Sequence, residues 1–167
     1  TYEEERIEYI LKYCTKKYVS RAAAAWDFID GYQGNPNDTG FAARNPLEAL
    51  ELIEKLTPET PAVFVLRDYD NFLKDLSVTR KIKNLSKTLK TQPKNIIIIS
   101  NEVNIPDPLK EIITVVDFPL PSYSEIQEEL KRLMDSIKQE ISIKDISSLT
   151  IACQGLSLIH ISEPTRP

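Results

Sequence analysis

Two short, uninterrupted apolar runs constrain the fold of this chain most. They are Val63–Leu66 (VFVL) and Ile96–Ile99 (IIII), each rich in β-branched or aromatic residues. Apolar runs of this length without polar alternation predict strands buried on both faces, as in parallel sheets covered by helices. Segments with helical spacing of apolar residues lie before and after each run. The alternation predicts an α/β fold with a parallel sheet and crossover helices.

The expected elements alternate along the chain. We expect helices at 2–18, 47–56, 70–89 (with an interruption allowed), 109–112, 125–138 and 144–153, and strands at 22–29, 62–66, 96–99 and 114–118. In the first helix Ile7, Ile10, Leu11 and Cys14 form the expected inward face. Residues 31–45 hold three of the four glycines, which predicts a loop.

Capping residues predict where helices begin and end. Asn45 is expected to cap the helix after the loop, with Pro46 in its first turn. Ser124 is expected to cap the helix that starts at Glu125, and Gly155 to close the last helix.

The composition bounds the class of protein. With 167 residues and 41% hydrophobic residues, the chain can bury a core, and its net charge of −4 favours neither nucleic acid nor anionic membranes. Cys14 and Cys153 lie far apart and fit no metal spacing, so free thiols in a reducing compartment are expected. The longest apolar runs are too short to span a membrane.

The stretch Ala62–Asp70 (AVFVLRDYD) resembles the Walker B strand of P-loop ATPases, with one departure. In a working ATPase an aspartate after the apolar run holds the Mg²⁺ shell, and the next acid polarises the attacking water. Here the first position is Arg67, whose charge repels a metal, and the second is Asp68, which we interpret as a relic acid. Alternatively, Arg67 simply pairs with Asp68, Asp70 or a helix carboxylate across the sheet end.

Three further blocks follow in the order of AAA+ ATPases. NIIIISNEVNIPDPLKEII resembles the strand, polar sensor residue and Pro-Asp-rich loop of that family, with Asn101 at the first sensor position. VVDFPLPSYSEIQEELKRLM resembles the last core strand and the proline-linked helix that leads into the helical lid. ISIKDISSLTIACQGLS resembles the start of that lid. Asn101 could instead be a local hydrogen-bonding residue.

A longer match points to one family. The stretch WDFIDGYQGNPNDTGFAARNPLEALELIEKLTPETPAVFVLRDYDNFL, followed by QPKNIIIIS, resembles the hypothetical chloroplast reading frame forty-six family of plastids and cyanobacteria. The resemblance implies that a divergent AAA+-like region, represented here, precedes a second AAA+ domain with the ATPase motifs. It also implies a location in the plastid stroma or the cyanobacterial cytoplasm.

The resemblance divides the chain into three parts. Residues 1–121 would be a degenerate AAA+ core, 122–155 the start of the lid, and 156–167 a tail whose LSLIHISEPTR matches a translated sequencing adapter. The tail contains His160, which we give no functional weight. AAA+ sheets place the strand of the phosphate cradle between the sensor strand and the last core strand. That strand would precede Thr1, so a gap is expected beside Ile96–Ser100.

The phosphate-binding motif is absent from the sequence. No G-x-x-x-x-G-K-[ST] occurs, and TYEEER places three glutamates where the first helix would face a triphosphate. We therefore expect a non-catalytic module without its own cofactor or metal, beside a second domain that uses ATP and Mg²⁺. The expected partners are that domain and neighbouring subunits. The alternative is an ATPase domain whose phosphate loop lies upstream of Thr1.

Two surfaces remain as candidates for binding. Gly34, Gly40 and Arg44 lie in the glycine-rich loop, which we interpret as a partner loop rather than a phosphate site, because Asp30 and Asp38 flank it. The basic face between Lys74 and Lys94 is expected to be solvated or to receive an acidic surface. It lacks interleaved aromatic residues, so nucleic acid is not expected there.

Overall fold

The computed structural model describes residues 4–19, 22–33, 40–137 and 143–155, which pack as two units. The first unit comprises Glu8–Val116, and the second combines Tyr2–Ile7 with Asp117–Pro167. Helix α1 (Glu4–Cys14) contributes residues to both units. The adapter-like tail with His160 lies outside the described residues.

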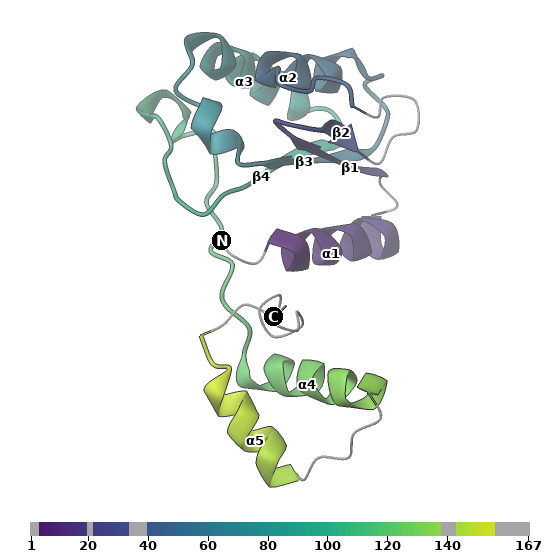
Figure 1. Cartoon of the computed structure of the whole chain (residues 1–167). Helices are drawn as coiled ribbons and strands as arrows, with labels where there is room; N and C mark the ends of the chain where they lie inside the picture. The colour runs from purple at the N-terminus through teal and green to yellow at the C-terminus, as the bar shows by residue number, and fades with distance from the viewer. Residues whose placement is uncertain (1–3, 20–21, 34–39, 138–142, 156–167) are drawn as a thin grey trace. The chain divides into compact units, whose positions relative to one another are not determined.

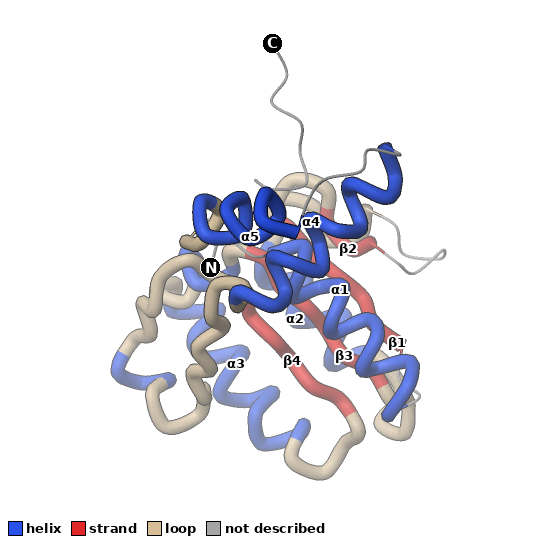
Figure 2. The backbone as a smooth tube through the Cα atoms, turned by 90° about the horizontal axis from the view of Figure 1, so that it is seen from below, coloured by secondary structure: helices blue, strands red, loops and turns tan. Residues whose placement is uncertain are grey.

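The first unit contains a four-stranded sheet in the order β2-β1-β3-β4. Its strands are β1 (Ala22–Asp27), β2 (Gly31–Gln33), β3 (Ala62–Arg67) and β4 (Lys94–Ile99). Strands β1, β3 and β4 are parallel, and β2 pairs antiparallel with β1. Figure 2 shows β4 at one edge, and within the described residues β4 pairs only with β3. The predicted α/β fold with a mostly parallel sheet and flanking helices is confirmed.

Two helices cover one face of this sheet, and α1 lies on the other (Figure 1). They are α2 (Pro46–Lys55) and α3 (Leu76–Leu89), and the main core lies between them and the strands. Trp26, Phe64 and Leu66 are almost completely buried there. Such burial removes apolar surface from water, which is the main driving force for folding. The core thereby fixes the carboxyl ends of β1 and β3 next to each other.

Capping residues set the ends of α2 and the start of α3. Asn45 Oδ1 accepts a hydrogen bond from the N–H of Glu48 at 3.2 Å, as predicted from its sequence position. At the other end, the buried ammonium of Lys94 donates to the carbonyl of Leu56 at 2.7 Å. The predicted helix 70–89 is interrupted: a 3₁₀ turn, η2 (Tyr69–Phe72), precedes α3, which Asp75 caps.

Three predictions about strands are wrong. Thr114–Phe118 is not a strand. The residues Ile96–Ile98 are only partly buried because β4 is an edge strand. The glycine-rich stretch was expected to be loop throughout, yet it begins with β2, which pairs with β1. Gly31 permits the tight turn before this strand, because it adopts φ 70° and a Cβ there would lie 2.5 Å from the carbonyl oxygen of Phe41.

Short helical turns complete the first unit. The π-helical turn η1 (Thr15–Val19) follows α1, and the 3₁₀ turn η3 (Asp107–Leu109) replaces the predicted helix 109–112. In α1 the prediction for Ile10 is wrong, since this side chain is 37% exposed, whereas Glu8 is buried.

The second unit contains helices α4 (Tyr123–Ile137) and α5 (Ile143–Ala152), which contact each other. Helix α4 begins two residues earlier than predicted, because its cap is Ser122 rather than Ser124. The N–H of Ser122 donates to the carboxylate of Glu125 at 2.8 Å, and the N–H of Glu125 donates to Ser122 Oγ at 3.4 Å, which together form a capping box. Ser122 Oγ also donates to the same carboxylate at 2.7 Å. Arg6 of the same unit pairs with Glu125 at 2.5 Å.

Candidate functional site at the carboxyl end of strand β3

The site is built around Arg67, the last residue of β3. In the parallel register Trp26 of β1 lies opposite Leu66, so Asp27 and Arg67 are neighbours at the carboxyl ends of the two strands. Arg67 NH1 lies 3.5 Å from Asp27 Oδ2. Its Nε donates to Glu8 Oε1 of α1 at 2.5 Å. Of the partners considered from the sequence, a helix carboxylate is the one found.

Glu8 is a buried carboxylate that the surrounding charges keep ionised. Its side chain is only 8% exposed, and burial opposes its charged form. The hydrogen bond and charge of Arg67, assisted by Lys12, outweigh this cost and hold the pKa of Glu8 below its ordinary value. Lys12 Nζ lies 3.5 Å from Glu8 Oε2. Both carboxylate oxygens of Glu8 therefore face cations.

Asp27 is held by the turn that follows β1. Its Oδ1 accepts hydrogen bonds from the N–H groups of Ile29 and Asp30, at 2.9 and 2.7 Å. Its Oδ2, which faces Arg67, also accepts from Gln33 Nε2 at 3.2 Å. Asp27 thus ties the β1–β2 turn to Arg67, and the guanidinium links the carboxylates of Glu8 and Asp27 in one cluster.

A small cavity of about 190 Å³ lies beside the cluster. Its lining consists of Glu8, Leu11, Lys12, Ala23, Ala25, Gln33 and Val65. Pockets for small molecules usually measure roughly 300–1,000 Å³. The cavity is therefore too small for a nucleotide.

Asp68 lies outside the cluster, in a backbone turn. It is exposed and adopts φ 50°, in the left-handed region. Its N–H donates to the carbonyl of Ile99 at 2.9 Å, which extends the pairing of β3 with β4 by one residue. Its own carbonyl accepts from Asn71 Nδ2 at 3.1 Å. The described contacts of Asp68 are those of a turn residue between β3 and η2.

The other candidate residues lie apart from Arg67. Asn101 is exposed in a bend after β4. The N–H of Gly40 donates to the carbonyl of Tyr32 at 2.9 Å, and that of Arg44 to the carbonyl of Phe28 at 2.6 Å, so the described half of the loop folds against the β1–β2 hairpin. Arg44 is exposed, and Gly34 lies outside the described residues.

Sequence reasoning missed the partners of Arg67. For Glu8 a signal existed: it lies three residues before Leu11 and seven before the buried Thr15, the spacing of one helix face. For Asp27 the signal was its position at the end of a predicted strand, beside the strand that ends in Arg67. Neither spacing identifies an ion pair before the strand order is known.

The described residues contain neither a cluster of metal ligands nor a membrane-spanning helix. Among residues 4–19, 22–33, 40–137 and 143–155, no group of three or more His, Cys, Asp or Glu side chains is arranged to hold a metal ion. No helix in this part of the chain is long and apolar enough to cross a membrane.

Comparison with known proteins identifies the family. The profile of the N-terminal domain of SpoVK-like AAA ATPases matches residues 1–118. The chain belongs to this family. It is also similar to proteins described as uncharacterized AAA domain-containing protein ycf46: 53% identical to that of Trieres chinensis, 49% to that of Guillardia theta and 47% to that of Pyropia yezoensis.

The matches to the ycf46 proteins cover almost the whole chain but only part of each relative. Each alignment spans 161 residues and 96% of this chain. It spans 32% of the first two relatives and 33% of the third. This SpoVK-like N-terminal domain therefore corresponds to about a third of the length of its curated relatives. The resemblance to the reading frame forty-six family is confirmed.

Proposed function

We propose that this chain is a non-catalytic module of a larger AAA protein, which acts in assembly, regulation or partner recruitment beside an ATPase domain. The observation that carries the proposal is the ion pairing of Arg67. By the resemblance to Walker B, Arg67 would occupy the position of the residue that holds the Mg²⁺ shell in P-loop ATPases. Its guanidinium engages the carboxylates of Glu8 and Asp27.

The residues at this position do not fit Mg²⁺. The ion requires near-octahedral oxygen ligands and is usually bound through one or two carboxylates plus substrate phosphates. Here the two carboxylates nearest to Arg67 already bind its guanidinium, and Asp68 forms a turn. A metal ion bound by these two carboxylates would have to displace Arg67. We therefore assign Arg67 the role of joining α1, β1 and β3.

The cellular setting is part of the same proposal. The ycf46 resemblance supports a plastid stroma or cyanobacterial cytoplasm. The second AAA+ domain expected in such a protein would bind ATP and Mg²⁺. The partners of this module would be that domain and neighbouring subunits.

A nucleotide-binding titration of the 167-residue chain tests the proposal. A fluorescent ATP analogue is added with and without Mg²⁺, and the single tryptophan, Trp26, reports that the chain stays folded. We expect no saturable binding by the wild type or by Asp68→Ala. Mg²⁺-dependent binding that Asp68→Ala abolishes would support the competing ATPase function.

The same measurement extends to the longer protein. The cradle lysine of the second domain is changed, and the analogue is titrated again. Complete loss of binding is the expected result. Residual binding in that variant would show that the first domain binds nucleotide.

A further inference from the structure

A groove of about 550 Å³ lies beside α3, between this helix and the loop that follows β4, and Leu50 of α2 also lines it. Its floor is formed by Ile96 and Ile98 of β4, and one wall by Leu85 and Leu89 of α3. The segment Glu111–Thr114 forms the opposite wall. The volume lies within the range of about 300–1,000 Å³ typical of ligand sites. The groove therefore lies beside α3 in the layer of helices that covers this face of the sheet.

The wall that α3 contributes is positively charged at its rim. Lys83, Ser86 and Lys90 are spaced three and four residues apart, so they lie along one flank of the helix. Ser86 and Lys90 line the groove. Arg80 and Lys87 extend the same charge toward solvent, and the helix (LSVTRKIKNLSKTL) contains no acidic residue. A chain with net charge −4 has thus segregated cations onto this helix.

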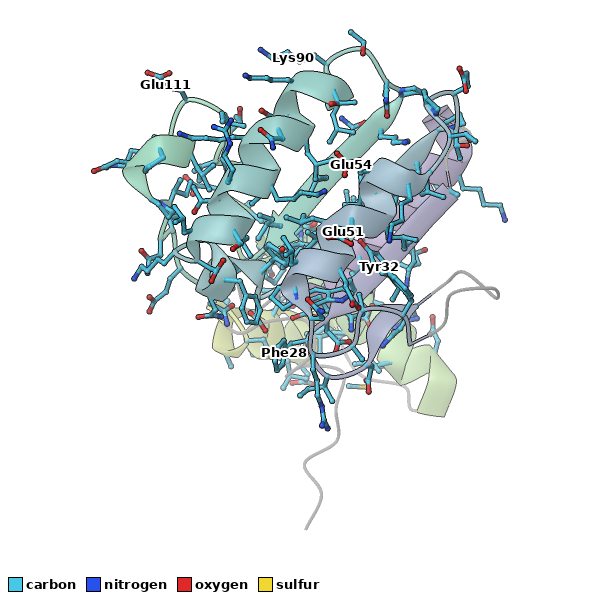
Figure 3. All side chains as sticks on the ribbon, turned by 90° about the horizontal axis from the view of Figure 1, so that it is seen from above. Phe28, Tyr32, Glu51, Glu54, Lys90 and Glu111 are labelled. Carbon is cyan, nitrogen blue, oxygen red and sulfur yellow. The ribbon has the colours of Figure 1, made fainter. Side chains whose placement is uncertain are left out.

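The opposite flank of α3 shows what such a cation binds. There Lys81 forms an ion pair with Glu54 of α2, and the Lys81 side chain is only 19% exposed. Helix α2 also carries Glu48 and Glu51. Figure 3 shows Glu51 and Glu54 on α2, and Lys90 at the end of α3 with Glu111 on the neighbouring loop. An acidic amphipathic helix is therefore the neighbour that α3 already has on one side.

From the groove and the charge together, we propose that a second acidic amphipathic helix, from another polypeptide or domain, packs beside α3 in this groove. Its apolar side chains would cover the partly buried Leu89, Ile96 and Ile98. Its carboxylates would face Lys83 and Lys90. This inference rests on the proposed recruiting function and names the surface and the chemistry of the partner. Helix-in-groove recognition of this kind uses apolar anchors one turn apart.

Glu111 determines on which flank of the partner helix the acidic residues must lie. It lies on the wall opposite α3, so a carboxylate of the partner on that side would be repelled. The acidic residues of the partner must therefore lie on the flank that faces α3. Lys94 takes no part, because its ammonium already binds the carbonyl oxygens at the end of α2.

A defined peptide tests the proposal on the full 167-residue chain. The probe is a fluorescein-labelled helical peptide of about 18 residues, roughly the length of a typical globular helix. It has leucines at positions i, i+3, i+4 and i+7 and glutamates along one flank. Fluorescence anisotropy measures its dissociation constant. We expect saturable binding that weakens with salt, and weakening of about tenfold or more in the double variant Lys83→Glu, Lys90→Glu.

Matched variants separate the groove from general charge. Lys16→Glu with Lys55→Glu makes the same change in net charge at two exposed residues that do not line the groove, and it should leave the dissociation constant within about twofold. Ser86→Phe places a ring in the groove and should abolish binding, while an unchanged unfolding midpoint shows that it folds. Glu111→Lys should tighten binding a few-fold.

Several outcomes would overturn the inference. These are absence of binding, an equal effect of the control pair, or equal binding of a peptide with lysines in place of the glutamates. Tighter binding of a single-stranded RNA oligonucleotide would indicate a nucleic-acid surface instead. If the chain forms a dimer and the double variant Lys83→Glu, Lys90→Glu dissociates it, the groove binds a second copy of this chain instead. None of these results bears on ATP binding, so failure here leaves the proposed non-catalytic role intact.

Discussion

Arg67 is the residue on which the packing at the carboxyl ends of β1 and β3 depends most. Its guanidinium links a helix and two strands through Glu8 and Asp27. In Arg67→Leu, the carboxylate of Glu8 would remain buried without its main partner. We expect the free energy of unfolding to fall by about 1–3 kcal/mol, the cost of an unsatisfied buried polar group. Urea titration followed by Trp26 fluorescence measures it.

The exposed Arg80 of α3 offers a matched control for this change. Arg80→Leu should alter the free energy of unfolding by less than about 0.5 kcal/mol, as is usual for surface positions. Equal losses in Arg67→Leu and Arg80→Leu would contradict a stabilising role for the cluster.

The lowered pKa of Glu8 predicts how stability depends on pH. The folded state binds the Glu8 proton less readily than the unfolded state, whose ordinary pKa is 4.5. The stability that Glu8 contributes is therefore fully present above that value and is lost as the pH falls through the lower, folded pKa. The difference in free energy of unfolding between wild type and Glu8→Gln should be greatest near neutral pH and shrink in acid. A difference that is constant with pH would contradict this assignment.

Asp68 matters for its backbone conformation. Aspartate tolerates the left-handed region better than most residues, because its short polar side chain can hydrogen-bond locally. We expect Asp68→Ala to lower the free energy of unfolding by about 1 kcal/mol, and Asp68→Asn or Asp68→Gly to change it by less. Thermal unfolding of the three variants compares them. A loss in Asp68→Asn as large as in Asp68→Ala would show that the charge, rather than the backbone, is important.

Helices and strands were predicted correctly where they depend on adjacent residues, and less well where they depend on a partner strand that is distant in the sequence. The strand β3 and the start of α2 follow from an apolar run and from the Asn45-Pro46 pair, which depend only on adjacent residues. Thr114–Phe118 has the composition of a strand, but a strand also needs a neighbour to satisfy its backbone groups. Where that neighbour is missing, Val116 remains 81% exposed.

The candidate site shows the same division. The position and charge of Arg67 could be read directly from the sequence. Its partners could not, because Glu8 and Asp27 are 59 and 40 residues away and meet it only through the strand order. Lys94 was also missed, since an ammonium that closes α2 from another strand leaves no local pattern.

The capping box of α4 gives a prediction for a single helix. Ser122→Ala removes the hydroxyl that binds Glu125, and a lost N-cap costs about 1 kcal/mol. Ser124 lies within the helix and contacts the cap only through its hydroxyl, 3.1 Å from Ser122 Oγ, so Ser124→Ala should have a smaller effect. Circular dichroism during thermal unfolding compares the two. A larger loss of stability in Ser124→Ala than in Ser122→Ala would indicate that Ser124 is the cap, as expected from the sequence.

In the first unit as a whole, the sheet face on which each helix lies indicates where a further parallel strand would pair. The strands run from β1 through β3 to β4, and the connecting helices α2 and α3 both lie on one face. Helix α1 leads into β1 from the opposite face (Figures 1 and 2). Crossovers between parallel strands are right-handed, so a helix on the opposite face accompanies a crossover that runs in the opposite direction. A parallel strand joined to β1 through α1 would therefore lie on the β4 side.

In a longer form of the protein, the edge of β4 is expected to be paired. When residues that precede Thr1 are present, we expect them to pair in parallel with β4 and to protect the amides of Lys94–Ile99 from hydrogen exchange. The amides of β2, at the opposite edge of the sheet, provide the internal control and should exchange equally in both forms. The shorter chain should also self-associate more readily, because an open apolar edge can pair with another chain. Unchanged exchange at β4 would mean that its edge stays open in the longer protein, and the handedness argument would then fail.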